Sequence, residues 1–410
     1  MHPQENAPTV HQNTVPPTSL LDLNVHCLLT IFCKLDLPDL TRASSVSHRF
    51  QDLAAEAFKY EWKNQLIRVS NISQDMKLEA TAVLRNFGNR LEKVEIAFDK
   101  HGNDKFFKMF VDKCGSQLTK LNFSCSCLNV NLEKILNKEN IRRCNEKFVN
   151  LKMMRFGDNI EHITQPECIE QHFPALEELN LNGSPFENQN IFQFVSYNPQ
   201  IKNLSSFHYN NILDAADMIE VIDQQVPQLE VLGLWIHGQT DDSEYQPRFL
   251  KALKCLMIQN HGTTANLQRL SISTERLVEM ELALSLCDKN SIDFICQHKE
   301  LTKLTIYIYT DNLFVSKYLA QLKKHLPKLT QIEIFGFWSD LNHTDIVLFV
   351  HGCQQLVKFI LRDNTRLNIL EDVVQLHKKL ESTQWTVRYI PSKRQLQFDQ
   401  VCNKRYEWKK

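Results

Sequence analysis

The residues of this chain best suited to chemistry are its thiols and imidazoles, and their spacing matches no catalytic or metal-binding arrangement. The 12 cysteines and 15 histidines are scattered singly. The closest thiols, Cys125 and Cys127, are separated by one residue and lack the further Cys or His ligands that a zinc site needs. Histidines near expected helix ends, such as His298 and His325, are more typical of capping than of catalysis.

Sequence motifs of common enzymes are also missing. The chain contains no Gly-x-x-x-x-Gly-Lys-Ser/Thr, Gly-x-Ser-x-Gly, His-Glu-x-x-His or Cys-x-x-Cys sequence. We therefore expect no catalytic residues, no metal and no cofactor, and we interpret the cysteines as reduced thiols that serve as small hydrophobic side chains.

Composition is that of a folded protein without a strong charge. The 410 residues are 43% hydrophobic, and 47 basic residues nearly balance 48 acidic ones, which argues against capture of nucleic acid or an anionic membrane. Residues 1–18 are polar and Pro-rich, which predicts a disordered tail and no signal peptide. No apolar run is long enough to span a bilayer. We expect a cytoplasmic or nuclear protein.

The stretch from Leu20 to Trp62 contains more apolar residues than so short a segment can bury by itself. Between Val25 and Leu35 they surround most of the expected helix, which is typical of a helix buried on all sides. Asn24 is a good N-cap for this helix, and residues 36–39, with Pro38 near the first helical position, end it and begin a second.

Two more helices are expected in this stretch. Ser47 can cap a third helix with Phe50 and Leu53 on a shared face, and a fourth would carry Phe58, Trp62 and Leu66 one turn apart. One face of this body would pack internally while another binds a second protein. The residues alone equally allow an ordinary N-terminal helical subdomain.

The register of the apolar residues from Leu23 to Leu53 resembles the F-box, the module that docks a substrate receptor onto the Skp adaptor of a cullin-based ubiquitin ligase. Two positions depart from the family pattern, since its Leu-Pro opening is Leu23-Asn24 here and its usual Trp is Phe50. The resemblance implies that a Skp adaptor, and through it a cullin scaffold, binds the side chains of Leu23, Leu28, Ile31, Phe32, Leu35, Val46 and Phe50.

From residue 91 onward the chain repeats the phrase Leu-x-x-Leu-x-Leu, with aliphatic or aromatic substitutions. The end of each phrase alternates as a strand does, and segments between phrases, such as 106–111 and 191–195, have helical spacing. Copies begin at Leu91, Leu118, Leu151, Leu176, Leu229, Leu267, Leu301, Leu329 and Leu356, with a weaker one at Ile201.

One strand and one helix cannot bury their own apolar face, so the units must stack. We therefore predict an α/β fold, a short N-terminal helical F-box followed by an irregular leucine-rich-repeat solenoid of about ten units, with a parallel sheet inside and helices outside. This arrangement resembles leucine-rich-repeat F-box proteins. The expected organisation is a disordered tail at 1–18, an F-box at 19–66, the solenoid at 67–390 and a basic C-terminal tail at 391–410.

Three stretches are less regular. We expect an acidic loop at 241–244 and then a helix around 249–258. Residues 277–282 fit either a strand or part of a longer helix, and the strand is favoured. Residues 385–390 alternate and are expected to form a last strand that closes the stack.

The residue directly after each phrase is expected to point to the concave face, because side chains alternate across a strand. This row reads Ala97, Ser124, Gly157, Asn182, Trp235, Ser273, Tyr307, Phe335 and Arg362.

The second half of the row is rich in the residue types that dominate binding hot spots. We predict that a target protein contacts Trp235, Tyr307, Phe335 and Arg362, together with Tyr309 one step further along its strand. The alternative is that the rings pack on each other without any ligand.

The implied function is that of a substrate-recognition subunit of an SCF-type (Skp–cullin–F-box) ubiquitin ligase. Such a subunit holds a target protein near a ubiquitin-charged enzyme and is not itself an enzyme. The expected partners are the Skp adaptor, a cullin scaffold and an unknown target protein, with no nucleic acid and no membrane. The alternative is a leucine-rich-repeat scaffold that binds partners without promoting ubiquitination.

Overall fold

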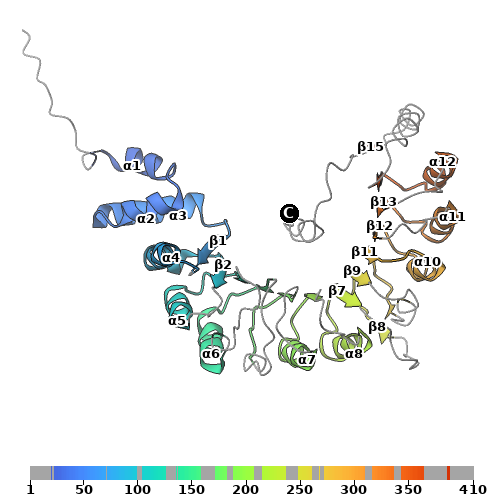
Figure 1. Cartoon of the computed structure of the whole chain (residues 1–410), viewed down its shortest axis with the longest axis horizontal. Helices are drawn as coiled ribbons and strands as arrows, with labels where there is room; N and C mark the ends of the chain where they lie inside the picture. The colour runs from blue at the N-terminus through green and yellow to red at the C-terminus, as the bar shows by residue number, and fades with distance from the viewer. Residues whose placement is uncertain are drawn as a thin grey trace, which may run out of the picture.

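The chain forms three N-terminal helices followed by a curved row of parallel strands with helices on its outer side (Figure 1). The computed structural model describes residues 20, 23–70, 72–98, 104–125, 135, 137–157, 171–181, 188–206, 215–236, 248–260, 267, 272–309, 316–336, 343–363 and 386–387. The predicted tails at 1–18 and 391–410 and the acidic loop at 241–244 lie outside these residues.

The first three helices, α1 (Val25–Phe32), α2 (Leu37–Ser44) and α3 (His48–Glu61), begin where the capping residues predict. In each one, a side-chain oxygen accepts a backbone N–H of the first turn, which otherwise has no helical partner. These bonds join Cys27 N to Asn24 Oδ1 at 2.8 Å, Asp39 N to Asp36 Oδ1 at 2.8 Å, and Phe50 N to Ser47 Oγ at 3.1 Å.

The separate fourth helix expected over Phe58, Trp62 and Leu66 was a wrong prediction. Instead α3 continues as one helix through Phe58, and Trp62 is its C-cap. Phe50 and Phe58, two turns apart, are both buried on the same side of α3. Their shared periodicity therefore belongs to one long helix.

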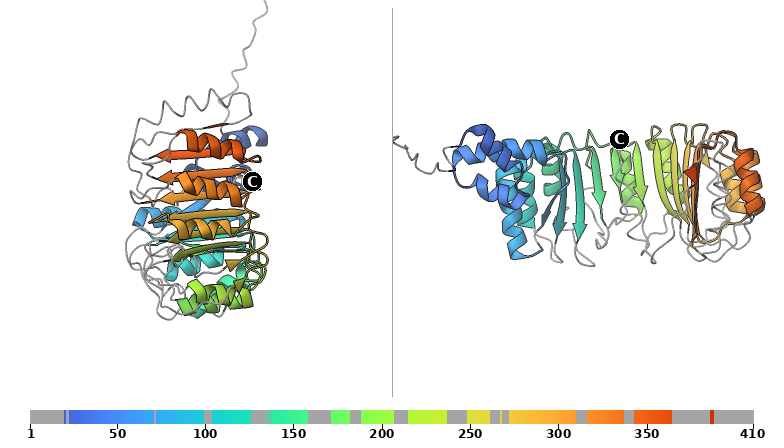
Figure 2. Two further views of the ribbon diagram at one scale, coloured as in Figure 1. Left: turned by 90° about the vertical axis from the view of Figure 1, so that its right-hand side faces the viewer. Right: turned by 90° about the horizontal axis from the view of Figure 1, so that it is seen from above.

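Most of the described strands form one parallel sheet that follows the order of the chain, and the N-terminal helices adjoin one end of it (Figure 2). Its 13 strands are β1 (Ile67–Ser70), β2 (Lys93–Phe98), β3 (Lys120–Cys125), β4 (Met153–Phe156), β5 (Glu178–Asn180), β6 (Asn203–Ser206), β7 (Val231–Ile236), β9 (Cys255–Asn260), β11 (Glu279–Leu284), β12 (Lys303–Ile308), β13 (Gln331–Gly336), β14 (Lys358–Asp363) and β15 (Thr386–Val387).

Helices cover the convex side of this sheet (Figure 1). They are α4 (Gln74–Phe87) with the short 3₁₀ turn η2 (Gly88–Arg90), α5 (Asp104–Lys113), α6 (Lys138–Lys147), α7 (Asn188–Tyr197), α8 (Ala215–Gln225), α10 (Lys289–Cys296), α11 (Ser316–His325) and α12 (His343–Gly352). The predicted helical segments 106–111 and 191–195 lie in α5 and α7. The α/β solenoid predicted from the repeated phrase is therefore confirmed.

Neighbouring units are joined by a recurring pair of backbone hydrogen bonds. The carbonyl of Glu92, directly after an opening leucine, accepts Thr119 N at 2.8 Å and Lys120 N at 3.0 Å. The same double acceptor recurs at Thr119, Lys152, Glu177, Lys202, Glu230, Lys254, Val278, Thr302 and Thr330. Because these contacts use backbone atoms only, the stacking tolerates irregular side chains between the leucines.

The hydrophobic core lies between the sheet and the helices and continues without a break into the N-terminal helices. Leu91, Val94 and Ile96 of the first phrase are all buried in it. Phe58 of α3 stacks on Phe87 of α4 with ring centroids 4.6 Å apart. This aromatic contact fixes the helical body to the solenoid.

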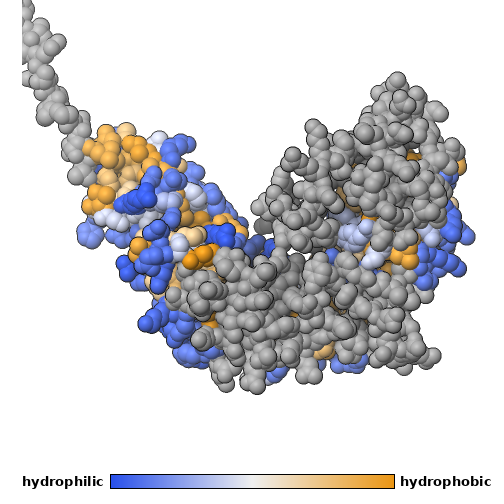
Figure 3. Space-filling model, in the orientation of Figure 1, coloured by the Kyte–Doolittle hydropathy of each residue, from blue (hydrophilic) through white to orange (hydrophobic). Residues whose placement is uncertain are grey.

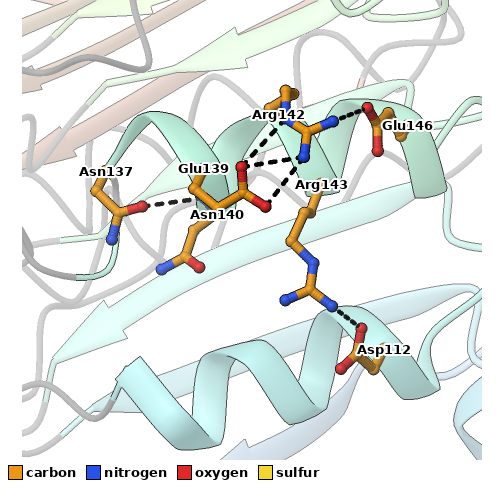
Figure 4. Close-up of polar contacts among 7 residues, drawn as sticks. All are labelled: Asp112, Asn137, Glu139, Asn140, Arg142, Arg143 and Glu146. Carbon is orange, nitrogen blue, oxygen red and sulfur yellow. Dashed lines mark hydrogen bonds and ion pairs between the residues drawn. The ribbon is translucent and has the colours of Figure 1, made fainter.

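Polar contacts join the outer helices of adjacent units (Figure 4). Arg143 of α6 pairs with Asp112 of α5. Asn140 Nδ2 donates to Asp104 Oδ1 at 2.8 Å and also to the carbonyl of Ile135 at 2.9 Å. A buried amide therefore links the start of α5 to α6.

The helix expected around 249–258 was also wrong. Residues 248–249 form β8, which pairs with β10 (Ile272–Ser273) in a separate two-stranded sheet, and Cys255–Asn260 form β9 of the main sheet. The true phrase of this unit is Leu253-x-x-Leu256-x-Ile258, so the copy assigned to Leu267 is not a strand of the main sheet. Two other predictions are confirmed: residues 277–282 contribute to β11, and residues 386–387 form β15 beside β14.

Candidate interaction surfaces

The interior of the N-terminal helical body holds three residues predicted to bind the adaptor. Leu28, Phe32 and Phe50 are only 0%, 2% and 4% exposed. The rings of Phe32 and Phe50 meet edge to face, with centroids 5.1 Å apart. In this conformation these side chains hold α1 against α3 and offer almost no area to a partner. The exposed members of the predicted adaptor-binding set offer the surface to a partner, and the set itself stays a prediction.

The exterior of the same body is apolar. Ile31 and Val46, both in the predicted set, are 40% and 64% exposed, and Leu23 and Leu35 are half-buried. Figure 3 shows hydrophobic residues gathered over these N-terminal helices. An apolar cluster over a rigid core is typical of a protein interaction site.

Two further exposed residues were absent from the predicted set. Leu20 is 52% and Val25 is 50% exposed. The spacing of Val25 from Leu28 and Phe32 places it on their side of α1, so periodicity predicts burial. Its exposure follows from its place as the first residue of the helix, which sequence spacing alone does not reveal.

The segment that precedes α1 is held in place by α3. Arg49 Nη2 donates to the carbonyl of Leu23 at 2.7 Å. A guanidinium bond to a carbonyl is a charge-assisted contact, and it fixes the chain next to the Asn24 cap. The half-buried Leu23 is thereby kept beside the exposed residues of α1.

The concave face of the solenoid brings the predicted target-binding residues into one row across neighbouring strands. Trp235 is in register with Gln259, which is followed by Ala283, and Tyr307, Phe335 and Arg362 continue the row. The side chains of Trp235 and Arg362 lie outside the described part of the chain. Ser273, predicted to belong to this row, lies in the separate sheet with β8, and Asn182 is outside the described residues.

Tyr307 and Phe335 stack on each other, with ring centroids 4.5 Å apart and planes 16° apart. Tyr307 is 9% exposed, while Phe335 is half-buried. Tyr309, just beyond β12, is half-buried and its backbone N–H donates to the carbonyl of Leu284 at 3.0 Å. Phe335 and Tyr309 therefore present more surface at this place than Tyr307 does.

Comparison with protein-family models identifies the helical body. The F-box domain model matches residues 20–60. Residues 20–60 are an F-box domain. The match covers α1 and α2 and nearly all of α3, so the exposed Val25, Ile31 and Val46 lie on the F-box itself.

Two other comparisons concern curated sequences and solved structures. Comparison with curated protein sequences finds no relative. Among solved structures, the complex of Rad7 and Elc1 in yeast matches at 16% identity and a TM-score of 0.38 over 83% of this chain and 88% of that one. An internalin from Listeria monocytogenes matches at 12% identity and a TM-score of 0.37 over 81% of this chain and 96% of that one. Likeness at these scores says nothing about activity or partners.

Buried titratable side chains are part of the solenoid core. Cys114, Cys144, Cys287 and Cys353 belong to the hydrophobic core, as predicted for cysteines used as small apolar residues. Burial raises the pKa of the Cys353 thiol to about 11. Among the described residues no group of His, Cys, Asp and Glu could hold a metal ion, and no helix is long and apolar enough to cross a membrane.

Proposed function

We propose that the chain is the substrate-recognition subunit of an SCF-type ubiquitin ligase. Its F-box would bind a Skp-type adaptor and thereby a cullin scaffold, and its solenoid would hold a target protein. The observation that carries the proposal is the exposure of four apolar side chains on the F-box, those of Leu20, Val25, Ile31 and Val46.

The physical argument starts from the cost of that exposure. Each of these side chains keeps much of its apolar area in water, and removing apolar area from water yields about 25 cal/mol per Å². The core beneath is complete, because Leu28, Phe32 and Phe50 fill it. The exterior residues therefore contribute little to the fold and are free to stabilise a complex.

The joint between F-box and solenoid supports a positioning role. Phe58 and Phe87 stack across the junction of α3 and α4, and both belong to the continuous hydrophobic core. A rigid joint keeps a bound target at a set position relative to the adaptor. Positioning of this kind raises the effective concentration of target lysines at a ubiquitin-carrying enzyme, which would perform the chemistry.

The test of docking is co-purification of the full chain with a Skp-type adaptor. We expect Ile31→Asp combined with Val46→Asp to abolish the complex, because each places a charge in an apolar interface. The matched control is Leu348→Asp combined with Val357→Asp, which alters residues 59% and 66% exposed at the far end of the solenoid. Equal adaptor binding by both folded double variants would refute docking through this surface.

A second measurement separates a ligase subunit from a scaffold. Proteins that co-purify with the chain should accumulate when the chain is depleted or the proteasome is blocked. Unchanged half-lives of every co-purified protein, with adaptor binding intact, would favour the scaffold function.

A further inference from the structure

The concave face changes character along the solenoid. On each strand, the side chains of the concave face alternate with buried apolar side chains that point toward the helices. On β2 these buried residues are Val94 and Ile96. On β1 to β5 the alternating positions carry four cations and two carboxylates, namely Arg68, Lys93, Lys120 and Arg155 against Glu95 and Glu178. On β9 to β14 the same positions include the apolar Met257, Ala283, Tyr307, Phe335 and Ile360.

Within the first half, two cations lie directly side by side. Lys93 of β2 is in register with Lys120 of β3. Like charges opposite each other on adjacent strands are destabilising, since each raises the energy of the other. Lys93 Nζ donates to the carbonyl of Asn64 at 3.1 Å. This acceptor is neutral, so the bond does not neutralise the positive charge of Lys93. An anion brought to these strands would interact favourably with both cations.

The two carboxylates of this region are each held by neighbours. Arg68 Nε lies 3.4 Å from Glu95 Oε1, which also accepts Ser124 Oγ at 3.0 Å. Burial raises the pKa of Glu178, while Lys120 and Arg155 act in the opposite direction. Both carboxylates are thus engaged with cations, and the basic excess of this region extends over β1 to β4.

We propose that the concave face of β1 to β4, defined here as the basic surface formed by Arg68, Lys93, Lys120 and Arg155, binds an acidic segment of the target protein. The inference rests on the proposed function and specifies the chemistry of the target. It follows from charge complementarity, since this basic surface belongs to a chain whose net charge is −1.

A peptide fits this surface better than a nucleic acid does. Glu95 and Glu178 interrupt the row of cations, so the positive charge lies at separate places, which suits spaced carboxylates better than a continuous row of phosphates. An acidic peptide also carries amides, which match the half-buried side chain of Asn203 on β6, beside the basic surface. The aromatic side chain of Phe335, further along the same face, is suited to an apolar residue of the same target.

The test measures fluorescence anisotropy of a labelled glutamate-rich peptide with one leucine, titrated with the full chain. We expect binding that weakens as salt is added, because exposed charges are screened. Lys120→Gln with Arg155→Gln should weaken it about 2- to 25-fold, since an exposed ion pair contributes ~1.4- to 5-fold. The matched control removes the same charge from the convex helix α5, through Lys105→Gln with Lys113→Gln, and should bind like the parent chain.

Three outcomes would overturn the inference. One is equal binding of a peptide with glutamine in place of every glutamate. Another is equal weakening by the α5 control. The third is tighter binding of a labelled single-stranded oligonucleotide that is lost in the Lys120/Arg155 variant, which would assign the surface to nucleic acid. If the chain still co-purifies with the adaptor in any of these cases, the proposed function stands and only the acidic-peptide inference fails. If the chain binds the peptide as expected but no adaptor, only the proposed function is refuted.

Discussion

Phe32 and Phe50 meet inside the F-box with ring planes 88° apart, so one aromatic edge points at the face of the other. This geometry is favourable for aromatic pairs because the positive ring edge faces the negative ring face. It joins α1 to α3, which are separated in the chain by α2. The pair therefore holds α1, which carries the exposed Val25 and Ile31, against α3.

Replacing Phe50 tests this structural role. We expect Phe50→Ala to lower the free energy of unfolding of the F-box by about 3–5 kcal/mol, because it deletes a buried ring and leaves a cavity. Urea unfolding followed by circular dichroism measures the change. Ile31→Asp should lower the unfolding midpoint less than Phe50→Ala does, since Ile31 is 40% exposed and Phe50 is 4% exposed. Equal stability of Phe50→Ala and the parent chain would contradict the role assigned to the ring.

The F-box shows which features of a short helical domain sequence can predict. Asn24 and Ser47 are predictable as caps because capping depends only on a side chain and an N–H a few residues away. The adaptor-binding residues are harder to predict, because apolar spacing does not distinguish burial in the chain from burial against a partner. Leu28 and Phe32 belong to the predicted adaptor-binding set, and the packing of α1 on α3 shows that both are buried within the chain.

A buried amide offers a second prediction, on the cohesion of the solenoid. Asn198 is fully buried, and its Nδ2 donates to the carbonyls of Phe194 at 2.8 Å and Gln171 at 3.0 Å, while its Oδ1 accepts Phe173 N at 2.8 Å. Asn198→Ala removes these partners and should cost about 2–5 kcal/mol, since each orphaned buried group costs about 1–3 kcal/mol.

The matched control for Asn198 is an exposed asparagine that also joins adjacent units. Asn150 Nδ2 donates to the carbonyl of Ser116 at 2.8 Å. Water can replace this exposed bond, so Asn150→Ala should change stability by less than about 1 kcal/mol. Thermal unfolding of both variants decides the matter, and a larger loss in Asn150→Ala would contradict the assignment.

Two glycines at the helix-to-strand turns give a third prediction. A Cβ on Gly88 would lie 2.7 Å from the backbone oxygen of Lys113 in the next unit, whereas a Cβ on Gly115 would make only ordinary contacts from 3.8 Å outward. Backbone atoms cannot rotate away as a flexible side chain can. Gly88→Ala should therefore destabilise the chain by about 1–3 kcal/mol, and Gly115→Ala should not. Urea midpoints of the two variants measure the difference.

The repeats show where sequence prediction succeeds and fails in the solenoid. The sequence predicts Tyr307 and Phe335 on neighbouring strands because each directly follows a complete Leu-x-x-Leu-x-Leu phrase. Equivalent residues of successive phrases pair in the sheet, and these two residues are paired. The strand at 255–260 was missed because the apolar residues of 253–258 also fit helical spacing. In addition, the residues from Leu267 to Ile272 fit the Leu-x-x-Leu-x-Leu pattern, so the phrase was assigned there. Gln259 therefore occupies the position in the row that was assigned to Ser273.

His298 combines burial with a missing hydrogen bond. Its side chain lies edge to face with Phe294 at 5.3 Å, and in the described part of the chain its Nε2 is buried without a hydrogen-bond partner. Burial lowers the pKa of His298 to about 4, because the apolar site disfavours the charged imidazolium. Its carbonyl accepts the N–H of the opening leucine, Leu301, at 3.1 Å.

Acid should therefore destabilise the solenoid through His298. The unfolded chain takes up a proton as pH falls through about 6.5, while the folded chain resists until about pH 4, so stability present above pH 6.5 is lost across this window. The loss contributed by this group approaches about 3 kcal/mol at pH 4.

The equivalent turn positions of other units supply the substitution that tests this. Phe148 and Phe173 are buried there, and their carbonyls accept the opening leucines at 2.9 Å and 3.0 Å. His298→Phe keeps an apolar ring in the turn and removes the titrating group. We expect its unfolding midpoint in urea to fall less than that of the parent chain between pH 7 and pH 4. Parallel pH profiles for the two proteins would show that His298 is protonated equally in both states, contrary to its burial.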